Sequence, residues 1–336
     1  HDHHSPAGEN PSHRLVWGIP LPWYKGLHLG IPYFGQLRRQ IKAFKPDFLH
    51  IATEGPLGLA GVLAAHAYGV PIVSSYHTNF FSYSRYYGPV ANALRLIAFP
   101  YFRAMHNATL KTFVPSQTEK QRLAVYKYKN LEVMSRGVDT QLFSPERRSD
   151  ELRKAWGASP DDLVMIYVGR VAAEKNLSLM IECYRRLKAK HNNAKLVIVG
   201  DGPEKEILQR NHPHFIFAGK RTSVDLARHY ASADLFIFPS FTETYGHVLM
   251  EALASGLIVQ SYDYAAAREN IIDGKNGYLA AFKNESAFLE TFERLLSEKS
   301  RHWQIAREAR LTANSLSWEK VIAKYEADLL ALKSNA

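Results

Sequence analysis

Short apolar segments alternate with helical segments along most of the chain, and this alternation constrains the fold more than any other feature. Continuous apolar runs such as 163–168 are typical of strands buried on both faces. Strand–helix alternation predicts parallel sheets, whose ligands gather beyond the carboxyl ends of the strands. The predicted strands are 13–18, 47–51, 71–76, 109–115, 163–170, 195–199, 214–220, 235–238 and 258–260, and the predicted helices include 33–44, 58–68, 89–105, 177–188, 247–255 and 318–332.

The stretch from Ala233 to Gly256 holds a strand, a polar loop and a short helix. This order presents a helix N-terminus to an anion, with the loop amides around Gly246 and His247 facing a phosphate. Glu251 lies past the first helical turn, where an acid gains little from the helix dipole. We therefore interpret Glu251 as an acceptor for paired sugar hydroxyls.

Glu243 precedes Glu251 with seven residues between them. This spacing resembles the Glu-x7-Glu signature of retaining nucleotide-sugar glycosyltransferases of the GT-B fold, family 4. The resemblance implies that Glu243 contacts the donor sugar and Glu251 the nucleotide ribose, whereas two solvated helix-end acids are the alternative. The residues of this stretch predicted to bind the donor are Glu243, Tyr245, Gly246, His247, Val248 and Glu251.

Two cations follow the predicted strand 163–170. Arg170 ends the strand after Gly169, and Lys175 starts the next helix, so both side chains can converge on one diphosphate. The segment resembles the Gly-Arg…Lys signature of the same family, whose cations stabilise the departing nucleoside diphosphate. Two surface cations near a loop are the alternative interpretation.

Two later loops bear on the identity of the donor. The family places its base-binding loop near Lys220 and Arg221. Many relatives have a Gly-Gly pair where this chain has Ala265-Ala266, which leaves the donor preference open. The sequence contains no Asp-x-Asp motif, so we predict no metal and no cofactor beyond the nucleotide-sugar co-substrate, of GDP, UDP or ADP type.

His77 ends the predicted strand 71–76, a favourable position for a functional side chain in an α/β sheet. Segments 75–80 and 85–88 resemble GDP-mannose-dependent α-mannosyltransferases and sulfoquinovosyl-lipid synthases of the same family. That resemblance implies that His77 faces the donor sugar and lines the acceptor cleft. The predicted catalytic residues are His77, Arg170, Lys175 and Glu243.

The predicted architecture is α/β of the GT-B class, with two Rossmann-like domains facing a central cleft. Residues 1–145 form the acceptor-side domain, residues 146–316 the nucleotide-sugar domain, and residues 317–336 a helix that crosses back to the first domain. Family members begin with a βαβ unit whose Gly-rich loop approaches the donor phosphates, and nothing before His13 resembles it. We expect the first domain either to lack this unit or to assemble its sheet differently.

The formal net charge of +10 favours an anionic partner, either nucleic acid, anionic lipid or a phosphorylated substrate. No recognition helix, zinc-ligand spacing or basic–aromatic interleaving occurs, so nucleic acid is not a predicted partner. No apolar run is long enough to cross a bilayer, so we expect neither a membrane span nor a signal peptide. The single cysteine, Cys183, is typical of a reducing compartment. We expect a cytoplasmic protein that can be peripheral on the inner face of the membrane.

Aromatic and apolar side chains near the N-terminus accompany a group of cations. They would suit an anionic membrane surface, while an aromatic packing loop followed by a solvated helix explains them equally well. The cations are Lys25, Arg38, Arg39, Lys42 and Lys45.

These features predict a retaining transferase that moves a mannose- or glucose-like hexose from a nucleoside-diphosphate sugar to an acceptor hydroxyl. Subgroup resemblance favours a lipid or glycolipid acceptor, followed by a polysaccharide or small polyol. No side chain is an obvious covalent nucleophile, so family resemblance implies front-face attack by the acceptor. A catalytically silent membrane-associated or scaffold module of the same fold is the rival, because an incomplete first domain would disable the enzyme.

Overall fold

The chain divides into two compact units. In this computed structural model the described residues are 16–20, 28–76, 88–242 and 246–334. One unit comprises His1–Met134 and Lys333–Ala336, and the other comprises Ser135–Leu332. The second unit begins ahead of the predicted boundary at 145/146, because the segment 135–145 is bonded to it. The amide of Val138 donates to the Leu316 carbonyl at 3.0 Å.

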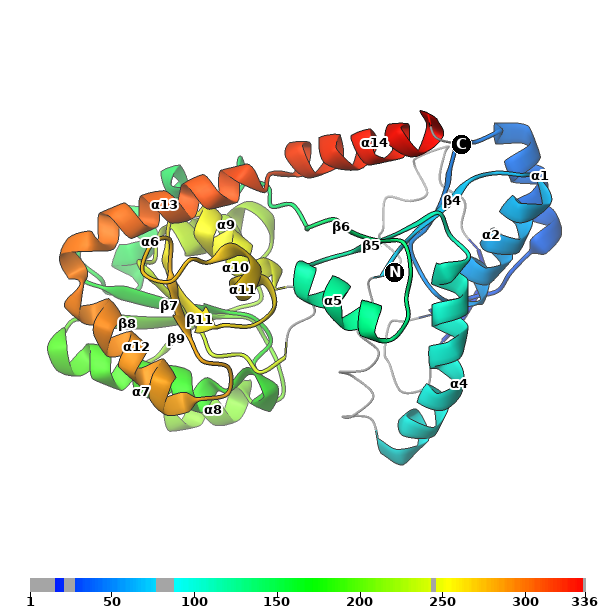
Figure 1. Cartoon of the computed structure of the whole chain (residues 1–336). Helices are drawn as coiled ribbons and strands as arrows, with labels where there is room; N and C mark the ends of the chain where they lie inside the picture. Colours follow the sequence, from blue (N-terminus) through cyan, green and yellow to red (C-terminus); the bar gives the residue numbers. More distant parts are fainter. Residues whose placement is uncertain (1–15, 21–27, 77–87, 243–245, 335–336) are drawn as a thin grey trace. The chain divides into compact units, whose positions relative to one another are not determined.

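The first unit contains a four-stranded parallel sheet in the order β3-β4-β5-β6 (Figure 1). A separate sheet pairs β1 and β2 antiparallel, so among the described residues ahead of β3 the strands form no parallel βαβ unit. The elements are β1 Gly18–Pro20, β2 His28–Gly30, α1 Phe34–Phe44, β3 Leu49–Ile51, α2 Pro56–Ala67, β4 Ile72–Ser75, α4 Gly88–Asn107, β5 Lys111–Val114, α5 Gln117–Val125 and β6 Leu131–Val133.

Helix α2 packs closely on β3 and lies beside α1 (Figure 1). Its small residues allow the close approach, since a Cβ added at Gly58 would lie 2.1 Å from the Thr53 carbonyl oxygen. The start of α5 is capped, and the sequence Ser116-Gln117-Thr118-Glu119 has the spacing that predicts a capping box. The Ser116 hydroxyl accepts the amide hydrogen of Glu119 at 3.1 Å.

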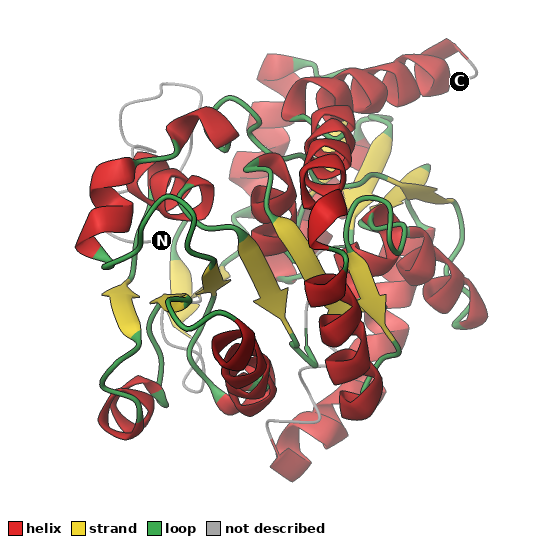
Figure 2. Ribbon diagram, turned by 90° about the vertical axis from the view of Figure 1, so that its left-hand side faces the viewer, coloured by secondary structure: helices red, strands yellow, loops and turns green. Residues whose placement is uncertain are grey.

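The second unit contains a six-stranded parallel sheet in the order β12-β11-β10-β7-β8-β9, and helices flank its strands in Figure 2. The chain adds strands outward from β7 to β9, then returns to place β10 on the other side of β7 and adds strands outward to β12. This is the strand order of a Rossmann fold. The predicted Rossmann-like topology is thus confirmed. The strands are β7 Val164–Val168, β8 Lys195–Val199, β9 Ile216–Gly219, β10 Leu235–Phe238, β11 Ile258–Tyr262 and β12 Tyr278–Ala280.

Helices cover these strands because the strands are apolar on both faces, and every residue of β7 and β10 is buried. The predicted crossing of 317–336 to the first domain stays a prediction. The helices are α6 Asp150–Ala155, α7 Leu177–Lys190, α8 Lys205–Asn211, α9 Ser223–Ala231, α10 His247–Ala254, α11 Ala265–Asn270, α12 Glu285–Ser297, α13 His302–Ser315 and α14 Trp318–Ser334.

The loops after β7 and β8 touch backbone to backbone, which requires glycine. Gly200 has a φ of 142°, and a Cβ on it would lie 1.9 Å from the Gly169 carbonyl oxygen. Gly169 has a φ of 154°, and its amide donates to the Val199 carbonyl at 3.0 Å. The turn after β8 therefore fixes the backbone that leads into Arg170.

Two predicted elements differ from the structure. Of the strand predicted over 13–18, only Gly18 lies in a strand, and residues 13–15 lie outside the described residues. The segment 262–269 was predicted as a loop, yet it contains most of α11. Ala266 and Ala267 favour helix there, once Tyr264 takes the extended conformation of an N-cap residue and Ala265 takes a positive φ.

Candidate functional site

Helix α10 follows β10, which pairs with β7 in the middle of the sheet. It begins at the carboxyl ends of these parallel strands, at the point where the strand order reverses. Gly246 is its N-cap residue, with a φ of 94° and a ψ of 51°, and glycine has no side chain to cap the helix. Glycine suits that left-handed conformation because it has no Cβ. The Leu249 amide bonds to the Gly246 carbonyl at 3.0 Å, and free amides at the start of a helix are the groups that bind anions in proteins.

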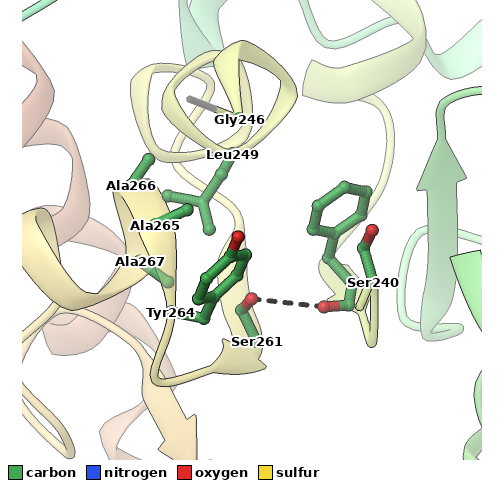
Figure 3. Close-up of a pocket in the computed structure, with 9 residues that line it drawn as sticks. Ser240, Gly246, Leu249, Ser261, Tyr264, Ala265, Ala266 and Ala267 are labelled. Carbon is green, nitrogen blue, oxygen red and sulfur yellow. Dashed lines mark hydrogen bonds between the residues drawn. The ribbon is translucent and has the colours of Figure 1, made fainter. Parts of the chain in front are cut away.

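A pocket lies at this point, between the starts of α10 and α11. The pocket is shallow and open, and the space between its walls is about 250 Å³ only when the open solvent in front of it is counted. Figure 3 shows the alanines of α11 on one side and Ser240 on the other. The Ser261 hydroxyl donates to the Phe238 carbonyl at 3.2 Å. The lining residues are Phe238, Ser240, Gly246, Leu249, Ser261, Tyr264, Ala265, Ala266 and Ala267.

Lys175 lies behind two of the residues that line the pocket. Its ammonium donates to the Thr242 carbonyl at 2.9 Å and to the Ser240 hydroxyl at 3.3 Å, and lies 5.8 Å from the ring centre of Phe238. A short 3-10 turn, Ala173–Lys175, carries the side chain toward β10. Lys175 thus contacts two residues that line the pocket, Ser240 and Phe238.

Arg170 lies in a more open environment than Lys175. Its side chain is 66% exposed, and its guanidinium lies 3.6 Å from the Glu174 carboxylate. Its carbonyl accepts the Tyr167 hydroxyl at 2.8 Å. The convergence of Arg170 with Lys175 on one diphosphate stays a prediction.

Glu251 projects from the second turn of α10 and is partly buried. Its Oε2 accepts the hydroxyl of Tyr230, a fully buried residue of α9, at 3.0 Å. Burial raises the pKa of the Glu251 carboxyl above its ordinary value, and the Tyr230 hydrogen bond opposes that rise. One turn earlier, burial lowers the pKa of His247, and the charge of Arg136 adds to this effect.

The other predicted donor-binding residues are placed as follows. Lys220 and Arg221 are exposed just after β9, and Arg221 donates to the Ala218 carbonyl at 2.8 Å and pairs with Asp225 at 3.1 Å. Val248 lies in the first turn of α10, where its carbonyl accepts the Tyr230 hydroxyl at 3.2 Å. The remaining predicted residues lie outside the described ones: His77, Glu243 and Tyr245.

Sequence reasoning missed Tyr230, Ser240 and Ser261. Tyr230 precedes Glu251 by 21 residues and belongs to another helix, so no local pattern connects the two. Ser240 follows β10, and Ser261 lies near the carboxyl end of β11. The carboxyl ends of parallel strands are where ligands bind, so their positions in the sequence were a usable signal. In the described part of the chain, no three His, Cys, Asp or Glu side chains are grouped as a metal site.

Ala265 lines the pocket in a conformation that suits glycine. Its φ is 51°, a left-handed value that costs a residue with a Cβ about 1–2 kcal/mol. Replacing Ala265 by glycine is therefore expected to stabilise the protein by about 1 kcal/mol in urea unfolding. Ala266 has no positive φ and lies inside α11, so Ala266→Gly is the matched control and is expected to destabilise by about 0.5–1 kcal/mol. Equal effects of the two variants would contradict this account.

The strand order and the position of α10 define an α/β protein with a helix N-terminus at the switch point of its second sheet, where proteins of this class bind ligands. Residues 148–312 match the family model "Glycosyl transferases group 1", and residues 2–142 match "Glycosyltransferase Family 4". The chain belongs to this glycosyltransferase family, family 4, which confirms the resemblance seen in its sequence motifs.

Similar curated proteins include glycosyltransferases with stated donors or products. The GDP-mannose-dependent alpha-mannosyltransferase of Mycobacterium tuberculosis is 33% identical over 96% of this chain and 86% of that protein. Its Corynebacterium glutamicum counterpart is 30% identical over 94% of this chain and 75% of that protein. The sulfoquinovosyl transferase SQD2 of Arabidopsis thaliana is 30% identical over 91% of this chain and 61% of that protein.

Solved structures show the same fold at lower identity. A glycosyltransferase from Rickettsia africae superposes with a TM-score of 0.70 at 18% identity, covering 90% of this chain and 81% of that one. Anabaena Alr3699/HepE in complex with UDP gives a TM-score of 0.72 at 19% identity, covering 90% and 84%. The predicted GT-B class is confirmed by these likenesses.

Proposed function

We propose that this glycosyltransferase moves mannose from GDP-mannose, with retention of anomeric configuration and without a metal, to a hydroxyl of a lipid or glycolipid acceptor. The observation that carries the proposal is the Lys175 ammonium, which bonds to Ser240 of the pocket that opens at the glycine N-cap of α10. A diphosphate in that pocket would meet a fixed cation and the positive end of a helix dipole.

The chemistry follows from where the charge develops. As the bond from the anomeric carbon to the diphosphate breaks, negative charge grows on the leaving oxygen beside Lys175 and the α10 amides. The acceptor oxygen bonds to the anomeric carbon on the face that the diphosphate leaves, and the hydroxyl proton passes to the departing phosphate oxygen. Arg170 adds positive charge, Glu243 and His77 orient the sugar, and Glu251 holds the ribose. Charge supplied by side chains and amides supports metal-independent transfer.

GDP-mannose is proposed as donor because several relatives at 30–33% identity carry that donor in their names. We propose a lipid acceptor because some relatives are named for glycolipid products. One is alpha-monoglucosyldiacylglycerol synthase of Acholeplasma laidlawii, which is 27% identical over 78% of this chain.

The test combines binding and product analysis. Thermal shift with GDP-mannose, GDP, UDP-glucose, UDP-sulfoquinovose and ADP-glucose should give its largest stabilisation with GDP-mannose or GDP. Transfer to lipid extracts with and without EDTA should be equal, and NMR of the product should show an α-linked mannose. A catalytically silent module would give neither transfer nor donor hydrolysis. Preference for another nucleotide would replace the proposed donor, and inhibition by EDTA would overturn metal independence.

A peripheral position on the inner face of the membrane is part of the proposal, and α1 supports it. This helix has no acid in its first turn and buries only Ile41. Phe34 and Phe44 are exposed large apolar residues of the helix, which would suit the headgroup region of an anionic membrane. In the described part of the chain, no helix combines the length and apolarity needed to span a bilayer. The exposed cations on and just after α1 are Arg38, Arg39, Lys42 and Lys45.

Vesicle sedimentation tests the membrane surface. Binding to vesicles with about 30% anionic lipid should exceed binding to neutral vesicles and should fall with added salt. The double variant Arg39→Glu, Lys42→Glu should lose most of this binding. Lys129→Glu, an exposed cation of the same unit outside α1, should retain it. Equal binding of the two variants would remove α1 from the proposal.

A further inference from the structure

Tyr230 is the polar side chain most completely buried beside the predicted ribose-binding acid. It is 0% exposed and belongs to α9, with its ring packed against Phe143 and Phe236 at centroid distances of 5.8 and 6.0 Å. These contacts fix the orientation of the ring and therefore the position of its hydroxyl oxygen. That position is beside the first two turns of α10, where Glu251 Oε2 lies at 3.0 Å and the Val248 carbonyl oxygen at 3.2 Å.

We propose that Tyr230 is a positioning residue, which holds the Glu251 carboxylate in place and in its charged form for two adjacent hydroxyls of the donor. This inference rests on the proposed function for the identity of the hydroxyls, which belong to the ribose of a nucleoside diphosphate. Tyr230 itself touches no substrate. It acts through Glu251.

The hydroxyl of Tyr230 has one proton and two acceptors. Burial and the Glu251 charge raise the pKa of the Tyr230 phenol well above its ordinary value, so it remains a donor. When Glu251 is ionised, the Tyr230 hydroxyl donates preferentially to the carboxylate, since hydrogen bonds to charged acceptors are stronger than those to neutral ones. When Glu251 is protonated, the same proton can turn to the Val248 carbonyl. The donation therefore favours the charged state of Glu251 and opposes the effect of burial.

Among the described residues, the charged groups around α10 have other partners, and Tyr230 is the residue that hydrogen-bonds Glu251. On α10 itself, His247 has a pKa lowered by burial, with Arg136 contributing. Arg310 of α13 is bound to the Ala254 carbonyl at the other end of α10. Arg268 of α11 is paired with Asp263 at 3.0 Å. Of these neighbouring side chains, only Tyr230 of α9 donates a hydrogen bond to the Glu251 carboxylate.

Tyr230→Phe removes the hydroxyl and keeps the ring. Its matched control is Tyr184→Phe, because Tyr184 is also buried in this unit and donates at 3.0 Å to the Ala194 carbonyl near the amino end of β8. Both variants lose one buried hydrogen bond and should lose similar stability, about 1 kcal/mol. Only Tyr230→Phe should change the site.

The first measurement needs no ligand. Carboxyl resonances of protein labelled with ¹³C at glutamate are titrated by NMR, and Glu251→Gln identifies the signal of Glu251. The pKa of Glu251 should be higher in Tyr230→Phe than in the wild type and unchanged in Tyr184→Phe. Superimposable Glu251 titrations in the wild type and Tyr230→Phe would overturn the inference.

The second measurement follows the affinity for GDP, UDP and ADP by calorimetry between pH 5.5 and pH 8. Because ionised Glu251 accepts the hydroxyls, Tyr230→Phe should weaken binding about tenfold at the acid end and less at the alkaline end. KM for the donor should rise while kcat stays nearly constant, since the contact is equal in ground and transition states. A loss independent of pH would assign Tyr230 a purely structural role and overturn the inference. If no nucleotide binds the wild type, the proposed function fails, and the NMR titration still decides the role of Tyr230.

Discussion

Replacing Lys175 by alanine is expected to lower kcat/KM for sugar transfer about a thousandfold. The ammonium lies 3.3 Å from Oγ of Ser240, which lines the pocket, and 2.9 Å from the Thr242 carbonyl oxygen. A cation held there without reorganisation stabilises charge that develops on the leaving diphosphate. Most of the loss should appear in kcat, because that charge is larger in the transition state than in the bound donor. Steady-state kinetics with the donor found by thermal shift measures the effect.

The controls separate charge from folding. Lys175→Arg keeps the charge and changes the geometry, so it should recover part of the activity. Lys190→Ala removes an exposed lysine of the same unit that pairs with Glu293 at 2.5 Å, and it should leave kcat/KM unchanged. Wild-type turnover in Lys175→Ala with an intact fold by circular dichroism would refute the assigned role.

Replacing Arg153 by alanine is expected to destabilise the second unit by about 3–5 kcal/mol, the largest stability effect of a single substitution that we predict. The side chain is 2% exposed and pairs with Asp234 at 3.1 Å. Its guanidinium also donates to the carbonyls of Ser232 at 2.9 Å and Ser159 at 2.8 Å. Removal takes one of three donors from the Asp234 carboxylate, which keeps Arg148 at 3.0 Å and the Val164 amide at 2.8 Å. It also leaves several buried carbonyls at the amino ends of β7 and β10 without the guanidinium as donor.

Urea unfolding followed by tryptophan fluorescence measures this loss. Arg153→Lys should recover only part of it, because one ammonium cannot reach the acceptors that a planar fork serves. The control Arg210→Ala removes an exposed arginine of α8 and should change the free energy of unfolding by less than about 0.5 kcal/mol. An effect of Arg153→Ala as small as that of Arg210→Ala would show that the buried pair contributes little.

Local pattern was sufficient for the elements around α10. The apolar run 235–238 is β10, and the helix predicted over 247–255 is observed over His247–Ala254. Both signals are short-range, one being a buried apolar run and the other a glycine at each end of a helix. The Ser116 cap was readable for the same reason, since donor and acceptor lie three residues apart.

Local pattern failed where a residue's conformation or partner depends on distant chain. The α11 segment follows β11 and adopts a helix only after Ala265 takes a positive φ, which alanine disfavours by itself. Arg153 belongs to α6, a short helix whose polar sequence predicts exposure to solvent. Its side chain is nevertheless buried and bonds to Asp234, 81 residues later. Neither outcome has a signature in its own neighbourhood.

The sequence by itself determined the alternation of strands and helices, the positions of the turn glycines, and membership of the glycosyltransferase family, because each depends on residues close together in the chain. The tertiary structure decided which side chains meet: Lys175 with Thr242, and Glu251 with Tyr230. Such pairs form when the order of parallel strands places separate loops and helices at one edge of a sheet. That order is a property of the whole packed unit, since it follows from how six strands and their helices bury their apolar faces together.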